Sequence, residues 1–106
     1  MISIETAFKI AEYLALASSL KENDPAADYR RANQLSWELA MCLHESLYKE
    51  VVMAIAAPTG SNNPLTVVVS VRKMIMRGMA GELTQDRVAH HAPGIGAGRH
   101  QQQEGK

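Results

Sequence analysis

The longest continuous helical pattern of the chain spans residues 25–57, which read PAADYRRANQLSWELAMCLHESLYKEVVMAIAA. We interpret this stretch as one long α-helix that ends before Pro58 and runs for about 50 Å at a rise of about 1.5 Å per residue. A leucine at every fourth residue forms a ridge along one side of the helix. The ridge consists of Leu35, Leu39, Leu43 and Leu47.

A second apolar ridge lies about a third of the way round the same predicted helix. One neighbouring helix does not cover two such ridges, so the excess favours association between copies of the chain. We expect a homodimer in which the second ridge forms the self-association surface. Its residues are Trp37, Met41, Tyr48, Val52 and Ile55.

The composition is typical of a soluble globular protein with one domain. The chain has 106 residues, of which 46% are hydrophobic and 21% charged, so wholesale disorder is not expected. Eleven basic and eleven acidic side chains leave no formal net charge, which argues against a nucleic-acid coat protein or a polybasic membrane binder. Charged residues interrupt the N-terminal region, and no apolar run approaches the ~20 residues that span a bilayer. We therefore expect a cytoplasmic protein that does not bind membranes.

Residues 4–21 have the periodicity of an amphipathic helix, with Ser3 as its expected N-cap. Ile4 belongs to the broad apolar face of this helix. Phe8 lies off that face, and either packs at its margin or contacts another chain.

Asp24 and Pro25 are typical of a helix start, because an aspartate can accept hydrogen bonds from free amides and a proline needs no amide partner at the first position. The polar connection before them is short. We therefore expect the first helix and the long helix to form an antiparallel helical hairpin.

Asn63 and Pro64 repeat this helix-start pattern before residues 65–79. The β-branched run that follows favours a strand by propensity, whereas an isolated two-stranded hairpin is only marginally stable and no turn residue interrupts the pattern. We favour a third helix over a strand. Glycines end this helix, and a short fourth helix is expected at residues 85–90.

The fold class expected from these elements is all-α. The arrangement is an antiparallel hairpin with a long central helix, a third helix and a short fourth, assembled as a dimeric helical bundle. A single helical domain spans residues 1–92. Residues 93–106 are rich in glycine and glutamine and offer nothing to bury, so we expect a flexible tail.

The predicted third helix carries more apolar surface than packing on one hairpin requires. Apolar side chains cover more than half of its circumference, with an arginine inside the arc, and Met and Arg are both enriched in protein interfaces. Its methionines, Met74 among them, are interpretable either as core or as an adaptable surface that repacks around a partner. The expected partner-binding residues are Leu65, Val68, Val69, Arg72, Met76 and Met79.

Arg72, Lys73 and Arg77 form a concentrated cluster of positive charge and support an alternative, a small DNA-binding regulator. Nucleic acid is the less favoured partner, because the chain is neutral and a helix that reads DNA presents polar side chains to the bases. Valines and methionines flank the cluster instead. A further alternative is a structural, phage-encoded protein that assembles only with itself.

No grouping of residues supports catalysis, a metal site or a cofactor. The histidines are scattered, no Cys or His pair has the spacing of zinc ligands, and no Ser-His-Asp or Cys-His arrangement is evident. Residues 94–99 resemble a phosphate-binding glycine loop only superficially, since no helix can follow them. The single cysteine, Cys42, is expected to be an inert buried thiol. We therefore expect a non-enzyme without a cofactor, with no catalytic or metal-binding residues.

In architecture and size, residues 4–91 are similar to the small all-helical antiactivators of bacterial quorum sensing, which occlude the dimerisation or DNA-binding surface of a transcription factor. The resemblance rests on no motif, so it assigns no site residues. It implies that the apolar, arginine-bearing third helix competes for a LuxR-type transcription factor. The expected function is therefore that of a protein-interaction module that inhibits such a factor.

Overall fold

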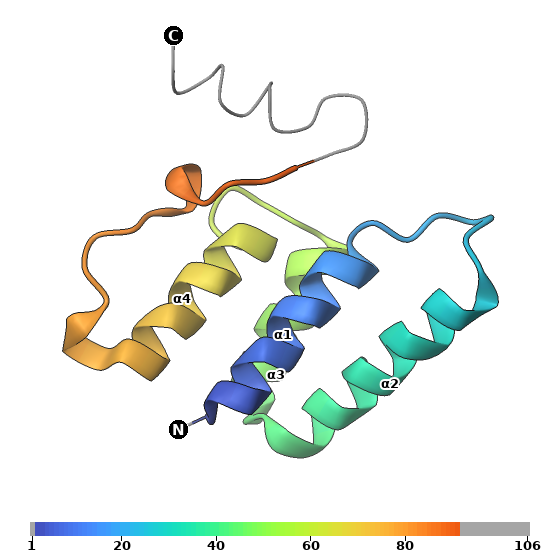
Figure 1. Ribbon diagram of the computed structural model, residues 1–106, viewed down its shortest axis with the longest axis horizontal. Coiled ribbons are helices and arrows are strands. Elements are labelled where there is room, and N and C mark those ends of the chain that lie inside the picture. The colour runs from blue at the N-terminus through green and yellow to red at the C-terminus, as the bar shows by residue number, and fades with distance from the viewer. Residues whose placement is uncertain (1, 92–106) are drawn as a thin grey trace, which may run out of the picture.

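The computed structural model describes residues 2–91. These residues form helices joined by turns and loops, and none of them forms a strand. The predicted all-α fold is confirmed, including a helix at residues 65–71, while the predicted tail at residues 93–106 lies outside the described residues. The elements are α1 (Ile4–Ala17), α2 (Ala26–Cys42), α3 (Glu45–Ala56), α4 (Pro64–Met76) and two 3₁₀ turns, η1 (Arg77–Met79) and η2 (Gln85–Arg87). In Figure 1, α1 lies in front of α3, with α2 on one side of this pair and α4 on the other.

The predicted long central helix is wrong, because the chain breaks it into two. α2 ends at Cys42, Leu43 has an extended backbone with φ −96° and ψ 147°, and α3 begins at Glu45. His44 stands at the N-cap of α3, where its Nδ1 accepts a hydrogen bond from the amide of Ser46 at 3.1 Å. Two shorter helices therefore replace the single helix.

The break keeps the leucine ridge in the core. Along an α-helix, a spacing of four residues advances about 40° beyond a full turn, so four leucines at this spacing drift through about 120°. A straight helix would carry the last leucine away from the side that buries the first. With the break, all four are buried: Leu35, Leu39, Leu43 and Leu47.

α1 is shorter than the helix predicted for residues 4–21. It starts as expected, since the hydroxyl of Ser3 accepts a hydrogen bond from a backbone amide of the first turn. It ends at Ala17, where the hydroxyls of Ser18 and Ser19 donate to carbonyl groups of the last turn. Such side-chain donors compete with continuation of the helix.

The connection between α1 and α2 differs from the predicted aspartate cap. The carboxylate of Asp24 accepts a hydrogen bond from the amide of Lys21 at 2.7 Å and so closes the turn before α2. Pro25 takes the N-cap position itself, without a side-chain cap from the described residues. Tyr29 donates its hydroxyl to the carbonyl of Lys21, which ties the first turn of α2 to this connection.

α4 starts with the cap predicted at Asn63. The Asn63 side chain accepts hydrogen bonds from the amides of Leu65 and Thr66, and the Thr66 hydroxyl accepts one from the Asn63 amide. Pro64 occupies the first turn, where no amide partner is needed. This reciprocal capping box stabilises the start of a helix whose β-branched residues alone favour a strand.

The chain after α4 turns back along that helix (Figure 1). Arg77 has a positive φ of 54°, and the α-helix ends there. Gln85 then reaches the loop before α4, where its Nε2 donates to the carbonyl of Gly60 at 3.0 Å and its Oε1 accepts from Asn63 at 3.1 Å. The short fourth helix predicted at residues 85–90 is only the 3₁₀ turn η2.

The core lies between the four α-helices, and each of them contributes to it. Its largest fully buried side chains are Ile10, Leu35, Leu39, Val51 and Val67. Among the described residues, no polar or charged residue is buried. Every polar or charged residue of the described part of the chain is therefore at least partly exposed.

Candidate interaction surfaces

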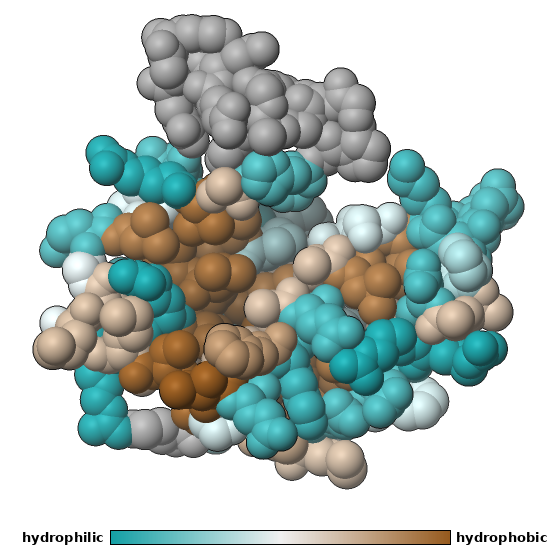
Figure 2. Space-filling view, viewed as in Figure 1, coloured by the Kyte–Doolittle hydropathy of each residue, from teal (hydrophilic) through white to brown (hydrophobic). Residues whose placement is uncertain are grey.

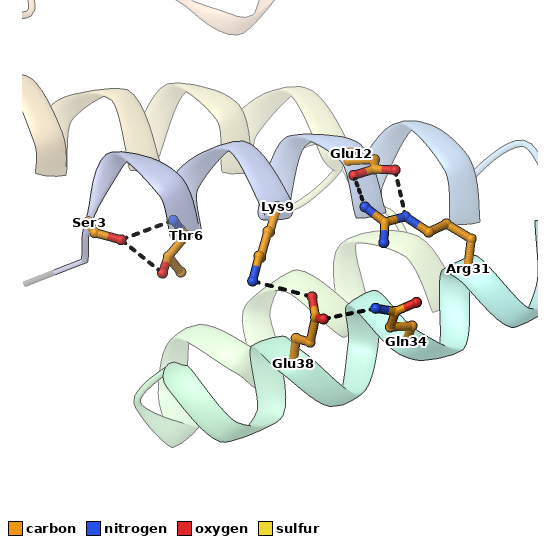
Figure 3. Close-up of polar contacts among 7 residues, drawn as sticks. All are labelled: Ser3, Thr6, Lys9, Glu12, Arg31, Gln34 and Glu38. Carbon is orange, nitrogen blue, oxygen red and sulfur yellow. Dashed lines mark hydrogen bonds and ion pairs between the residues drawn. The ribbon is translucent and has the colours of Figure 1, made fainter.

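A polar seam joins α1 to α2 on one face of the bundle (Figure 3). Arg31 donates hydrogen bonds from Nε and Nη2 to the carboxylate of Glu12, at 2.8 and 2.7 Å. The Nζ of Lys9 lies 3.4 Å from the carboxylate of Glu38, which also accepts a hydrogen bond from Gln34 at 3.1 Å. The charged groups of this seam are therefore paired with one another within the fold.

Both carboxylates of the polar seam are held in the ionised form. Hydrogen bonds from Arg31 lower the pKa of the Glu12 carboxyl. Hydrogen bonds from Gln34 and from Lys9 lower the pKa of the Glu38 carboxyl. A carboxyl that acts as a general acid needs its pKa raised toward the working pH. The seam is thus typical of ion pairing between helices and not of acid–base catalysis.

The predicted partner-binding residues do not form one exposed face. Val68 packs against the core, and Leu65, Val69 and Met76 are half-buried. Met79 is 82% exposed but lies in η1, beyond the end of α4. Both 3₁₀ turns contact α4, so the chain itself covers part of the surface that the sequence pattern assigned to a partner.

Arg72 is turned toward its own chain. Its Nη2 donates a hydrogen bond to the carbonyl of the buried Ala80 at 2.7 Å. Lys73 and Arg77 are exposed. One of the three cations that suggested the DNA-binding alternative, Arg72, is therefore engaged within the fold.

The break between α2 and α3 divides the predicted self-association ridge. On α2, Trp37 is 66% exposed and Met41 is 80% exposed. On α3, Tyr48 and Ile55 pack against the core and Val52 is half-buried. Trp37 and Met41, the two residues of this ridge on α2, are therefore the ones that another molecule can reach.

Two large hydrophobic side chains of α1 are exposed, Ile4 at 60% and Phe8 at 68%. The sequence pattern indicated Phe8, which lies off the apolar face, but it placed Ile4 on that face. Figure 2 shows hydrophobic side chains gathered over α4 and the adjoining part of α1. On α4, Val68 and Ile75 are partly buried against the core and share one side of the helix. We refer to Ile4, Phe8, Val68 and Ile75 together as the α1–α4 surface.

A hollow of about 460 Å³ lies at the break between α2 and α3. The thiol of Cys42 is exposed there, which corrects the expectation of a buried cysteine, since α2 ends at this residue. No group of three or more His, Cys, Asp or Glu side chains in the described part of the chain could hold a metal ion. The hollow is lined by Ile2, Cys42, His44, Ser46, Leu47 and Met74.

Comparisons of the chain with protein-family models, with curated proteins and with solved structures found no match. Within residues 2–91, every helix is too short or too polar to cross a membrane. The surface of the described residues presents exposed apolar side chains on α1 and α2, together with ion pairs that join α1 to α2.

Proposed function

We propose that this chain is a non-enzymatic regulator that binds and inhibits a transcription factor, as an antiactivator, through the α1–α4 surface. The observation that supports the proposal is the exposure of Phe8, at 68%, and of Ile4, at 60%, on α1, a helix that contacts α4. Hydrophobic side chains gather over α4 and the adjoining part of α1 (Figure 2). Large apolar side chains that gather on a surface are typical of sites where proteins bind one another.

The neighbouring charges are compatible with burial by a partner. Glu12 is paired with Arg31, and Lys9 with Glu38, so these groups bring their own counter-charges when water is removed from the surface around them. An unpaired charge at the same place would oppose binding, because its desolvation would not be compensated.

The shape of α1 favours a helix as the bound element. Ala11 and Ala15 follow Phe8 at helical spacing and are exposed, so two small side chains continue the stripe that the two large ones begin. Small side chains allow two helix axes to approach closely, and an aromatic side chain near the centre of a contact commonly contributes most of its binding energy. Phe8 is therefore the expected anchor.

The test is affinity capture of the tagged chain from a nuclease-treated native lysate, followed by identification of the bound proteins. We expect the native chain to capture a transcription factor and the Phe8→Asp variant to lose it. Met53→Asp is the matched control, because Met53 is 49% exposed on α3, outside the α1–α4 surface. The captured factor, once purified, should lose binding to its DNA when the native chain is added.

Three results would contradict the proposal. The native chain could capture no transcription factor, or Phe8→Asp could capture it as well as the native chain does. The factor could also bind DNA equally well with and without the chain. A gel shift by the chain alone at low salt, weakening steeply as salt is added, would replace the proposal with the DNA-binding alternative.

A further inference from the structure

α2 forms one edge of the bundle, and its outer face is not covered by the other described residues (Figure 1). The outer face follows positions three and four residues apart along the helix. It includes Trp37, at 66% exposed, and Met41, at 80% exposed, and its other members are exposed as well. The residues of the outer face are Ala26, Arg30, Asn33, Gln34, Trp37 and Met41.

We propose that the outer face of α2 binds a second copy of this chain, in an antiparallel pair of α2 helices. A two-fold interface requires a surface that complements itself, so that each contact occurs twice. With the axis between Asn33 and Gln34, Arg30 of each copy meets Trp37 of the other, because these two residues lie equally far from the axis. The proposal uses a different face from the α1–α4 surface and does not depend on the function proposed for it.

The contact between Arg30 and Trp37 is chemically favourable. Arg30 forms no hydrogen bond or ion pair with the other described residues, so its guanidinium is available. A guanidinium above an indole ring is attracted by the ring's electron density, and tryptophan is the best partner for such a contact. The two-fold axis repeats the contact, so the pair of helices contains it twice.

The remaining positions fit the same register. Met41 of one copy meets Ala26 of the other, so a long side chain lies against a small one. Asn33 meets Gln34 across the axis, where their carboxamides can exchange hydrogen bonds. The Nε2 of Gln34 already donates to Glu38 at 3.1 Å, which leaves its Oε1 free to accept from the second copy. The antiparallel direction also places opposite ends of the helix dipoles together.

A contact of one helix with one helix is small among stable protein interfaces, so the dimer should be weak. We expect a dissociation constant of about 10 to 100 µM. Sedimentation equilibrium over a range of concentrations measures this constant. Trp37 is the single tryptophan of the chain, so a concentration-dependent change in its fluorescence reports on the same face.

The decisive variants exchange the two residues of the contact. Trp37→Arg places an arginine against Arg30 at both contacts, and we expect the dissociation constant to rise at least about tenfold. The double variant R30W/W37R restores an arginine against a tryptophan at both contacts, and it should dimerise as the native chain does. Met53→Arg is the matched control on α3 and should leave dimerisation unchanged. Circular dichroism establishes that each variant keeps its helices.

The direction of the pair is measured through Cys42, the single cysteine, which is exposed. Nitroxide labels at Cys42 of two antiparallel copies should lie about 25 to 35 Å apart, whereas a parallel pair would bring them within about 20 Å. Three results would overturn the proposal. The native chain could stay monomeric up to about 1 mM, or the double variant R30W/W37R could dimerise as weakly as Trp37→Arg does. The two nitroxide labels at Cys42 could also lie within about 20 Å of each other, as in a parallel pair. Phe8→Asp should dimerise normally, so this proposal and the proposed regulatory function can fail separately.

Discussion

The Nδ1 atom of His44 accepts a hydrogen bond from the backbone amide of Ser46 at 3.1 Å, and the hydroxyl of Ser46 lies 3.0 Å from the same nitrogen. Through this contact a histidine caps α3, at a position where serine, threonine, aspartate and asparagine are the usual residues. Leu43, immediately before it, is extended. The start of α3 therefore depends on one side-chain acceptor at the break between two helices.

Replacing His44 should weaken the start of α3. His44→Ala removes the acceptor and should lower the free energy of unfolding by about 0.5–2 kcal/mol, the usual cost of losing an N-cap. His44→Asn supplies a side-chain oxygen at the same place and should keep most of the stability. Urea denaturation followed by circular dichroism measures both. Equal destabilisation by the two substitutions would show that His44 acts through packing in the hollow and not as a cap.

The polar seam should make the stability depend on acid pH. The pKa of Glu12 and that of Glu38 are lower in the folded chain than in the unfolded chain, so the unfolded chain takes up more protons as the pH falls. Their contribution is therefore complete above the ordinary glutamate pKa of about 4.3 and is lost as the pH falls through the lower folded values.

The matched variant for this pH dependence is E12Q/E38Q, which removes both titrating groups. It should lose less stability between pH 7 and pH 3 than the native chain does, and the difference should shrink in high salt because the seam is exposed to solvent. Urea midpoints at each pH measure the effect. An identical loss in the native chain and the variant would assign the acid sensitivity to other carboxyl groups.

The helix ends could be predicted from the sequence where the cap is of a common type. Ser3 and Asn63 cap α1 and α4 as expected, and both act through side-chain oxygens. The end of α2 was missed because no glycine or proline marks it and the cap that follows is His44. The drift of the leucine ridge around a straight helix was a signal for a break, but it does not say between which residues the break falls.

The candidate surfaces could be predicted only in part, because a helical pattern shows which residues share a side and not what covers that side. Trp37 and Met41 are exposed, whereas Tyr48, from the same predicted ridge, packs against the core after the break. Arg72 was assigned to a partner surface, yet its hydrogen bond goes to Ala80, in a segment that folds back from beyond the helix. Such a return of the chain has no periodicity that a sequence pattern could reveal.

Truncation of a core leucine should test the packing directly. Leu39 is fully buried at 0% exposed, so Leu39→Ala should lower the free energy of unfolding by about 2–5 kcal/mol through lost contacts and a residual cavity. Met79 is 82% exposed, and Met79→Ala should change it by less than about 0.5 kcal/mol. Urea denaturation measures both variants. A small effect of Leu39→Ala would contradict the position of α2 in the fold.

Arg72 should hold the returning segment against α4. Arg72→Met removes the donor to the carbonyl of Ala80, and a lost hydrogen bond from a charged group should raise amide hydrogen exchange in residues 81–88 by about tenfold or more. Exchange in α1 and α3 should stay unchanged, because the effect is a local opening. Lys73→Met, at the adjacent exposed position, is the control and should leave the exchange of residues 81–88 as it is in the native chain. Arg72→Lys should restore part of the protection, since an ammonium group can donate one hydrogen bond to the same carbonyl. Faster exchange throughout all four helices would instead make Arg72 a determinant of global stability, and unchanged exchange would mean that the contact with Ala80 does not anchor the segment.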